Sequence, residues 1–400
     1  MVSAQHQAKS TLFFSCIAHA YAHMFVLLYA TAVLVIMPAL GMPYPELIWL
    51  SVPGFVMFGA GAVPAGWLAD RWSAPGMLTI YFLGLGAASI ITGLASSPIG
   101  LLVGLTLIGT FASIYHPVGI ALIIAGSKNR GRALGINGVF GNVGTGLAAV
   151  LAGALADSFG WRAAFIVPGG IAFATGIWFY VAVLQGKISD GRQDVMPHTA
   201  PTGGEQMRGF ALLAITTLCI GLAFTSTSVG LPKFFSERVP EWAGQGALGA
   251  GVLVSIVYFV SASGQLIGGE LADRFTLKWV YFGGHLLQIP MILLAMASQE
   301  IVLVIAIAVM ATVNMGAQPA ENVLVARFTP LAWRNRVFGF KFVITLGVGS
   351  MGAALIPTIH QAFGSMDGLL WALLAFAGTA AIVTMALPNL RATPSFEPAE

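Results

Sequence analysis

The chain has 400 residues, of which 57% are hydrophobic and only 8% are charged, and its formal net charge is +3. A soluble domain carries about 25% charged residues, so this composition excludes a water-soluble globular protein and makes lipid the solvent for most of the surface. The arginines are scattered among short loops, which argues against a basic surface for nucleic acid.

Apolar segments long enough to cross a bilayer, about 20 residues each, recur along the whole chain. They predict an all-α membrane protein with twelve transmembrane helices in two six-helix bundles. The first six helices are expected near residues 11–40, 46–69, 75–95, 98–125, 133–156 and 162–184. The second six are expected near residues 209–235, 247–272, 277–297, 300–327, 334–359 and 367–388.

The positions of the basic residues predict which side of the membrane each loop faces. On the twelve-helix topology, the outer side holds only Arg162, Lys233 and Arg238, and Lys341 lies inside a helix. The inner side holds Lys9, Arg71, Lys128, Arg130, Arg132, Lys187, Arg192, Arg208, Arg274, Lys278, Arg327, Arg334, Arg336 and Arg391. Because positive charge is retained in the cytoplasm, both termini are expected there.

The first predicted helix carries His19 and His23, which are four residues apart and therefore share one face. Ionisable side chains inside a membrane are costly and need a reason, and we assign both histidines, with Tyr29 further along, to a solute-binding cavity. Histidines satisfied in helix contacts are one alternative. Metal binding is another, but Ala20 stands where the helical zinc motif needs a glutamate, so we expect no metal.

The second predicted helix ends in Gly66-Trp67-Leu68-Ala69-Asp70-Arg71. An acid at an inner helix end can cap a neighbouring helix or pair with an arginine from another loop, and Arg132 is a candidate partner. We therefore assign Asp70, Arg71 and Arg132 to a gate that closes the inner side. Anchoring of the loop at the membrane surface is the alternative.

The fourth predicted helix carries Tyr115-His116-Pro117 near its middle. Pro117 has no backbone N–H, so it is expected to kink the helix and expose polar backbone toward the cavity. His116, a residue type with an unperturbed pKa of about 6.5, is assigned both to solute binding and to proton exchange. A histidine bonded to a carbonyl freed by the kink is the alternative.

Beyond these helices the sequence predicts close packing and a division of the chain. Glycines crowd the fifth helix at residues 135, 138, 141, 144 and 146, which indicates that another backbone approaches closely. Residues 185–208 are polar and have no apolar periodicity, so they are expected to form a cytoplasmic linker. The linker joins an N-terminal bundle, residues 1–184, to a C-terminal bundle with a short tail, residues 209–400.

The second half repeats the loops of the first. Gly269-Glu270-Leu271-Ala272-Asp273-Arg274 follows the first hexad by 203 residues, and Arg334-Asn335-Arg336 follows Arg130-Gly131-Arg132 by 204. A nearly constant offset indicates duplicated halves, which can rock about a site at their interface. Asp273, Arg274 and Arg336 are accordingly added to the predicted gate.

The tenth predicted helix carries Gln318, Glu321 and Asn322 on one face. A carboxylate in a membrane needs a partner, and Lys341 in the eleventh helix is the nearest group of the right kind. We assign Gln318, Asn322 and Lys341 to solute binding, and Glu321, together with His116, to proton coupling. Structural neutralisation of Glu321 by Lys341 is the alternative.

The two hexads, their spacing and their apolar context resemble the signature loop of the major facilitator superfamily, which joins helices 2 and 3 and, more weakly, helices 8 and 9. The segment Ser113-Ile114-Tyr115-His116-Pro117 and the histidine-bearing stretch 15–24 resemble the fosmidomycin-resistance branch of bacterial exporters. The resemblance implies the facilitator fold, alternating access and efflux. The chain departs from that branch at Ala22-His23 and Val118, and Leu105 stands where drug and proton antiporters place an arginine.

Together these features predict a multi-pass secondary transporter of the bacterial inner membrane. We expect proton-coupled efflux of a drug-like or organic anionic compound, and uptake of a small metabolite such as a carboxylate is the alternative. The expected partners are the solute, protons and membrane lipid, without nucleic acid, and the chain is expected to act as a monomer. No nucleophile, metal or phosphate-binding constellation indicates an enzyme, so neither catalysis nor a cofactor is expected, and a non-transporting receptor is a further alternative.

Overall fold

The computed structural model describes residues 3–127, 130–188, 204–328, 341 and 343–388. Within these residues all regular secondary structure is helical. Twelve helical spans in this part of the chain are long and apolar enough to cross a membrane. Each span overlaps one of the twelve segments predicted from the sequence, so the predicted all-α transmembrane fold is confirmed.

The first six spans comprise nine helices, because two spans are broken. Their bounds are α1 (Ala4–Leu40), α2 (Tyr44–Trp49), α3 (Val52–Ala60), α4 (Ala62–Arg71), α5 (Ala74–Gly93), α6 (Pro98–Ala112), α7 (Tyr115–Gly126), α8 (Arg130–Phe159) and α9 (Ala163–Leu184). The second span runs through α2, α3 and α4, and the fourth runs through α6 and α7.

The second six spans begin with a long helix that carries the chain back across the membrane. Their bounds are α10 (Gly204–Arg238), α11 (Pro240–Ala243), α12 (Leu248–Arg274), α13 (Leu277–Leu286), α14 (Gln288–Ala297), α15 (Glu300–Phe328), the π-helix η2 (Val343–Val348), the 3-10 helix η3 (Gly349–Met351), α17 (Gly352–Phe363) and α18 (Gly368–Met385). The short α11 precedes α12 and is not itself a span.

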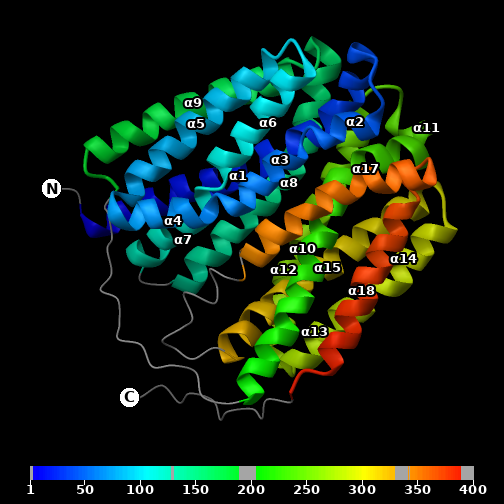
Figure 1. Ribbon diagram of the computed structural model, residues 1–400. Helices are drawn as coiled ribbons and strands as arrows, with labels where there is room; N and C mark the ends of the chain where they lie inside the picture. Colours follow the sequence, from blue (N-terminus) through cyan, green and yellow to red (C-terminus); the bar gives the residue numbers. More distant parts are fainter. Residues whose placement is uncertain (1–2, 128–129, 189–203, 329–340, 342, 389–400) are drawn as a thin grey trace.

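The helices gather into two sets that follow the order of the chain (Figure 1). In the first set α1 packs along α8 and α5 along α9, and in the second α12 packs along α15 and α10 along α18. The sets meet where α8 lies against α12, α1 against α10 and α2 against α17. We interpret each set as one bundle of the predicted pair; residues 189–203 of the predicted linker lie outside the described residues.

The fourth span is interrupted next to a proline, as the sequence predicts. Helix α6 ends at Ala112 and α7 begins at Tyr115. Pro117 has no N–H to donate to the carbonyl four residues earlier, so the helical ladder cannot continue through this point. The Ser113 hydroxyl instead donates to the Thr110 carbonyl at 2.7 Å. The break places His116 in the first turn of α7.

Helix α8 comes very close to α1 on one side and to α12 on the other because glycines line both contacts. A Cβ atom at Gly144 would lie only 2.1 Å from the Ala20 carbonyl oxygen, and one at Gly153 only 2.7 Å from the Ala247 oxygen. These separations are shorter than such atoms can adopt, so these two contacts require glycine. Gly135, on the same helix, has no atom within 4 Å of its Cβ position.

This difference predicts opposite outcomes for the same substitution on one helix. Gly144→Ala should force α1 and α8 apart and destabilise the protein by about 1–3 kcal/mol, as overpacking generally does. Gly135→Ala should leave stability unchanged or raise it by up to about 1 kcal/mol, because alanine is the better helix former. Thermal unfolding of both variants in the same detergent measures the difference. Equal melting temperatures would contradict the contact.

Candidate functional site

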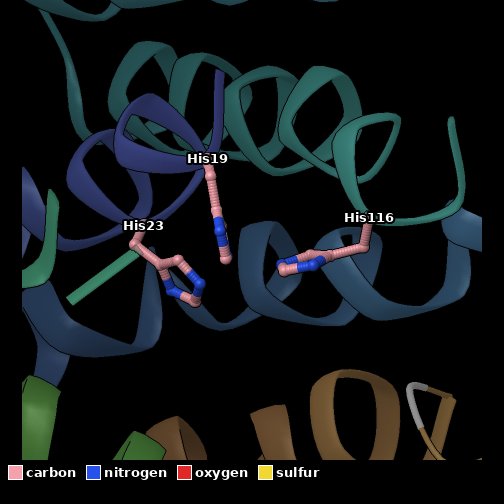
Figure 2. Close-up of side chains that lie close together, drawn as sticks. All are labelled: His19, His23 and His116. Atoms are coloured by element: carbon pink, nitrogen blue, oxygen red, sulfur yellow. The ribbon is translucent and has the colours of Figure 1, made fainter. Parts of the chain in front are cut away.

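Three histidines from two helices face one another within the first set of helices. His19 and His23 project from α1, and His116 projects from the first turn of α7, as Figure 2 shows. The ring centroids lie 5.1 Å apart for His19 and His23, 5.3 Å for His19 and His116, and 5.4 Å for His23 and His116. We call this group the histidine cluster. The structure thus brings His116 of the fourth predicted helix next to the two histidines of the first.

The histidine cluster lies next to the second set of helices. Ala18 and Ala22, the residues before the two α1 histidines, are fully buried, whereas His19 and His23 are partly exposed. The ring of Phe224, which belongs to α10 in the second set, lies 6.2 Å from that of His23. Partly exposed polar groups halfway along an apolar helix are typical of the wall of a solute pathway.

Asn137 of α8 holds the histidine cluster in place. Its backbone carbonyl oxygen lies 2.7 Å from His19 Nδ1. Its side-chain oxygen accepts a hydrogen bond from the Tyr115 hydroxyl at 2.8 Å, and its amide nitrogen donates to the Ser15 carbonyl at 3.0 Å. The Tyr115 ring in turn stacks on His19, with centroids 4.9 Å apart and planes 25° from parallel. One asparagine therefore ties α1, α7 and α8 together at the cluster.

Tyr29, predicted to bind solute, lies away from the histidine cluster. It is ten residues beyond His19 on the same helix, about 15 Å along the axis. Its side chain is 2% exposed, and its hydroxyl donates to the Leu47 carbonyl at 2.8 Å. These contacts indicate that Tyr29 contributes to the packing of α1 against α2.

A second polar group lies in the other half, where α15 meets α10. Glu321 is 2% exposed; its Oε1 accepts a hydrogen bond from the Thr217 hydroxyl at 2.5 Å and lies 3.3 Å from Lys341 Nζ. Lys341 also donates to the side-chain oxygen of Asn322 at 2.5 Å. We call these four residues the acid–lysine cluster. It places Glu321, Asn322 and Lys341 together, and it adds Thr217.

Gln318 reaches toward the seam between the two sets of helices. Gln265 of α12 donates to the Gln318 side-chain oxygen over 3.4 Å, and a Cβ at Gly138 of α8 would lie 3.5 Å from the Gln265 oxygen. These contacts place Gln318 beside the contact of α8 with α12, apart from the hydrogen bonds of the acid–lysine cluster.

The helix ends that carry the two hexads hold most of the predicted gate residues. Asp70, Arg71, Asp273 and Arg274 are exposed there. Arg71 lies over the Trp67 ring at 4.2 Å, and Arg274 pairs with Glu270 of its own helix. Arg132, near the start of α8, is also exposed, whereas Arg336 lies outside the described residues. The predicted gating role of these residues stays a prediction.

The opposite end of the seam, which the sequence predicts to face outward, is held by a carboxylate that the sequence did not single out. Asp157, at the end of α8, accepts hydrogen bonds from the backbone N–H groups of Ala247 and Leu248 at 2.8–3.0 Å. These groups begin α12, where backbone N–H groups and the helix dipole favour an anion. A Cβ at Gly246 would lie only 2.3 Å from Asp157 Oδ2, so glycine makes room for this contact. We call it the outer latch.

Sequence analysis did not assign Asp157, Thr217 or Asn137 to the site. Asp157 binds backbone N–H groups, and a sequence does not show which backbone groups an acidic side chain will contact. Thr217 is one of several hydroxyl residues in α10. Asn137 had a usable signal, because it is an amide within a glycine-rich, membrane-spanning helix.

The outer latch should bias the protein toward the arrangement seen here. Asp157→Ala removes the acceptor for the N-terminus of α12 and should cost about 1 kcal/mol, as loss of a helix cap does. The outer ends should then separate several-fold more often. Crosslinking of Ser158→Cys with Gln245→Cys, both on exposed residues beside the latch, should slow accordingly.

Glu241→Ala is the matched control, because it removes an exposed acid of α11, at the same end of the helices as the latch. It should leave the outer crosslinking rate unchanged. A rate that Asp157→Ala also leaves unchanged would show that the latch does not hold the outer end together.

Comparisons with known proteins identify the family. A family model described as Major Facilitator Superfamily matches residues 13–340. The fosmidomycin resistance protein of Escherichia coli (strain K12) is 24% identical over 345 residues, covering 82% of this chain and 80% of that protein. The gallate transporter of Pseudomonas putida is 26% identical over 386 residues, covering 86% and 84%.

Other matches are more partial or more distant in sequence. The puromycin resistance protein of Streptomyces alboniger is 28% identical over 148 residues, and the match spans only 29% of that protein. A bacterial homologue of the human lysosomal transporter Spinster, solved in an inward-facing and unoccupied conformation, superposes with a TM-score of 0.78. It covers 97% of this chain and 99% of that one at 14% identity, which shows a shared fold. The chain therefore belongs to the major facilitator superfamily and is a membrane transporter of small solutes.

Proposed function

We propose that this protein exports a drug-like or organic anionic compound across the bacterial inner membrane, driven by protons, with both termini in the cytoplasm. The observation that carries the proposal is the buried Glu321 paired with Lys341 in a membrane-spanning half. The similarity of this chain to the fosmidomycin resistance protein, along most of both chains, supports efflux. The two sets of helices would alternate access by rocking about the seam of α8 and α12.

The acid–lysine cluster supports proton coupling because its ion pair depends on the charge of Glu321. Ionised Glu321 attracts the Lys341 ammonium, and Thr217 donates to the same carboxylate oxygen. Protonation removes the attraction, so the ion pair exists only while Glu321 is ionised. The carboxylate lies beside Ala320 and Leu324 of an apolar core, where an uncompensated charge is costly. Binding of a proton by Glu321 is therefore linked to the ion pair with Lys341.

The proposal predicts a specific loss when Glu321 can no longer ionise. Glu321→Gln keeps the size of the side chain and an acceptor for Thr217 but binds no proton. We expect transport driven by a pH gradient in proteoliposomes to fall by about tenfold or more, while solute binding at equilibrium persists. Glu270→Gln is the control, because that exposed acid pairs with Arg274 one turn along its own helix. Gradient-driven transport at the normal rate in Glu321→Gln would reject Glu321 as the proton carrier.

Uptake of a small carboxylate is the second candidate, and two observations favour it. The gallate transporter aligns with 86% of this chain, and Lys341 lies between Glu321 and Asn322, where an anion could replace the glutamate. An anion bound at Lys341 would leave Glu321 without its partner and so promote protonation. Proton and anion would then bind together, which is the linkage of a symporter.

The pH dependence of solute binding distinguishes the two candidates. A solute whose site requires the ionised Glu321–Lys341 pair competes with the proton, so its affinity should rise with pH, as proton-driven export requires. An anion that displaces Glu321 from Lys341 binds with a proton, so its affinity should fall as pH rises. Titrations at two pH values, repeated in Glu321→Gln, measure the sign. An affinity that responds to pH equally in Glu321→Gln would contradict both assignments.

A further inference from the structure

We propose that His19, His23 and His116 form a binding site for a divalent transition metal ion such as Zn²⁺, Ni²⁺, Cu²⁺ or Co²⁺. This site is separate from the acid–lysine cluster and goes beyond the proposed proton-coupled transport. Sequence analysis considered metal binding by the two histidines of α1 and did not expect it, because they lack the glutamate of the helical zinc motif. The third ligand comes from α7, across the bundle.

The three histidines supply nitrogen ligands at a spacing that a metal can use. One ligand nitrogen from each ring lies within 4.8 Å of the others. His19 and His23 are one helical turn apart, the arrangement in which two histidines of a helix bind one zinc ion. Imidazole is a preferred ligand for Zn²⁺, Cu²⁺ and Ni²⁺. The histidine cluster therefore has the ligand type and number of an open three-histidine metal site.

The orientation of His19 is the strongest support for a ligand role. Its Nδ1 lies 2.7 Å from the Asn137 carbonyl oxygen, which can only accept a hydrogen bond. Nδ1 therefore carries the proton, and Nε2 keeps its lone pair. Metal-binding histidines characteristically donate their other nitrogen to a carbonyl or carboxylate in this way, which fixes the ring and its tautomer. Stacking of Tyr115 on the ring adds a second constraint.

Gly141 of α8 makes the space in which the His19 ring lies. A Cβ atom there would be 2.7 Å from His19 Nε2 and 2.8 Å from its Cε1. Any larger residue would push the ring from its position. Gly141 therefore allows the His19 ring, with its Nε2 atom, to keep this position.

Only small motions separate this arrangement from a coordinated one. Nitrogen ligands 2.0–2.1 Å from a tetrahedral zinc ion lie about 3.3 Å from one another, somewhat closer than the present limit of 4.8 Å. His23 contacts the rings of Phe58 and Phe224 at centroid distances of 6.4 Å and 6.2 Å. These loose ring contacts leave His23 room to rotate toward its neighbours.

Three histidine ligands leave one coordination position of a tetrahedral ion open. His19 and His23 are partly exposed, and His23 lies next to Phe224 of the second set, so the site lies near the contact of the two sets, where the proposed transport would carry a solute. The ion can arrive hydrated, or it can arrive held by a chelating organic solute that fills the open position. Both sources use the same coordination by the histidine cluster.

Metal binding to the purified full chain, in detergent and with any affinity tag removed, tests the proposal without any proton gradient. Co²⁺ should bind one per chain, with the visible absorption bands of a nitrogen-ligated site, and Zn²⁺ should displace it. His23→Gln should weaken binding by about 100-fold. His6→Gln, which changes an exposed histidine outside the cluster, should leave binding unchanged.

Gly141→Ala provides a variant that removes no ligand, with Gly135→Ala as its control. It should weaken Co²⁺ binding by about tenfold, as loss of a ligand's positioning generally does, while the control binds normally. Two results would overturn the proposal: no binding at about 1 mM Co²⁺ or Zn²⁺, alone or chelated, or binding that His23→Gln leaves unchanged. Either would show that the rings serve packing alone.

Parallel titrations with Zn²⁺ alone and with Zn²⁺ held by a bidentate hydroxamate distinguish the two sources. Binding of the bare ion in the wild type and its loss in His23→Gln would assign the site to a free ion. Binding of the chelate alone, lost in the same variant, would assign it to a metal-chelating solute. Both results support the site. Neither depends on Glu321, so failure here leaves the proposed proton coupling standing.

Discussion

Direct contact between backbones along α8 is the feature on which the rest of the structure depends. Without side chains at Gly144 and Gly153, α8 can lie against α1 in its own set and against α12 in the other. The same helix supplies Asn137 and Gly141 to the histidine cluster and Asp157 to the outer latch. A shift of α8 would therefore move the polar groups of the first half and the seam between the halves together.

The two halves share a scaffold but carry different chemistry. The first half presents three imidazoles, which are good ligands and can be neutral in an apolar surrounding. The second presents a carboxylate and an ammonium, which stabilise each other as long as both are charged. Duplication of the loops, visible in the repeated hexads, thus preserved the helices while the polar residues diverged. Under the proposed mechanism, this separation would allow one half to hold a solute or ion while the other responds to protons.

The fold was largely predictable because lipid imposes a simple rule: every span must be apolar and long enough to cross the membrane. The break at Pro117 followed from the missing N–H of proline. Lys341 could be predicted as the partner of Glu321 because an unpaired charge in a membrane is costly. In the structure, Lys341 Nζ lies 3.3 Å from Glu321 Oε1. What the sequence could not give was the meeting of His116 with His19, because they are 97 residues apart and only the order of helices in space brings them together.

The proposed transport requires the two sets of helices to rock about the seam of α8 and α12. Distances between spin labels measure this most directly when one pair spans the outer latch, at residues 158 and 245, and another spans the inner hexads, at residues 72 and 275. When solute or pH is varied in one sample, the account predicts opposite changes, with the outer distance growing as the inner one shrinks. Distances that stay fixed, or that change in the same direction, would contradict it.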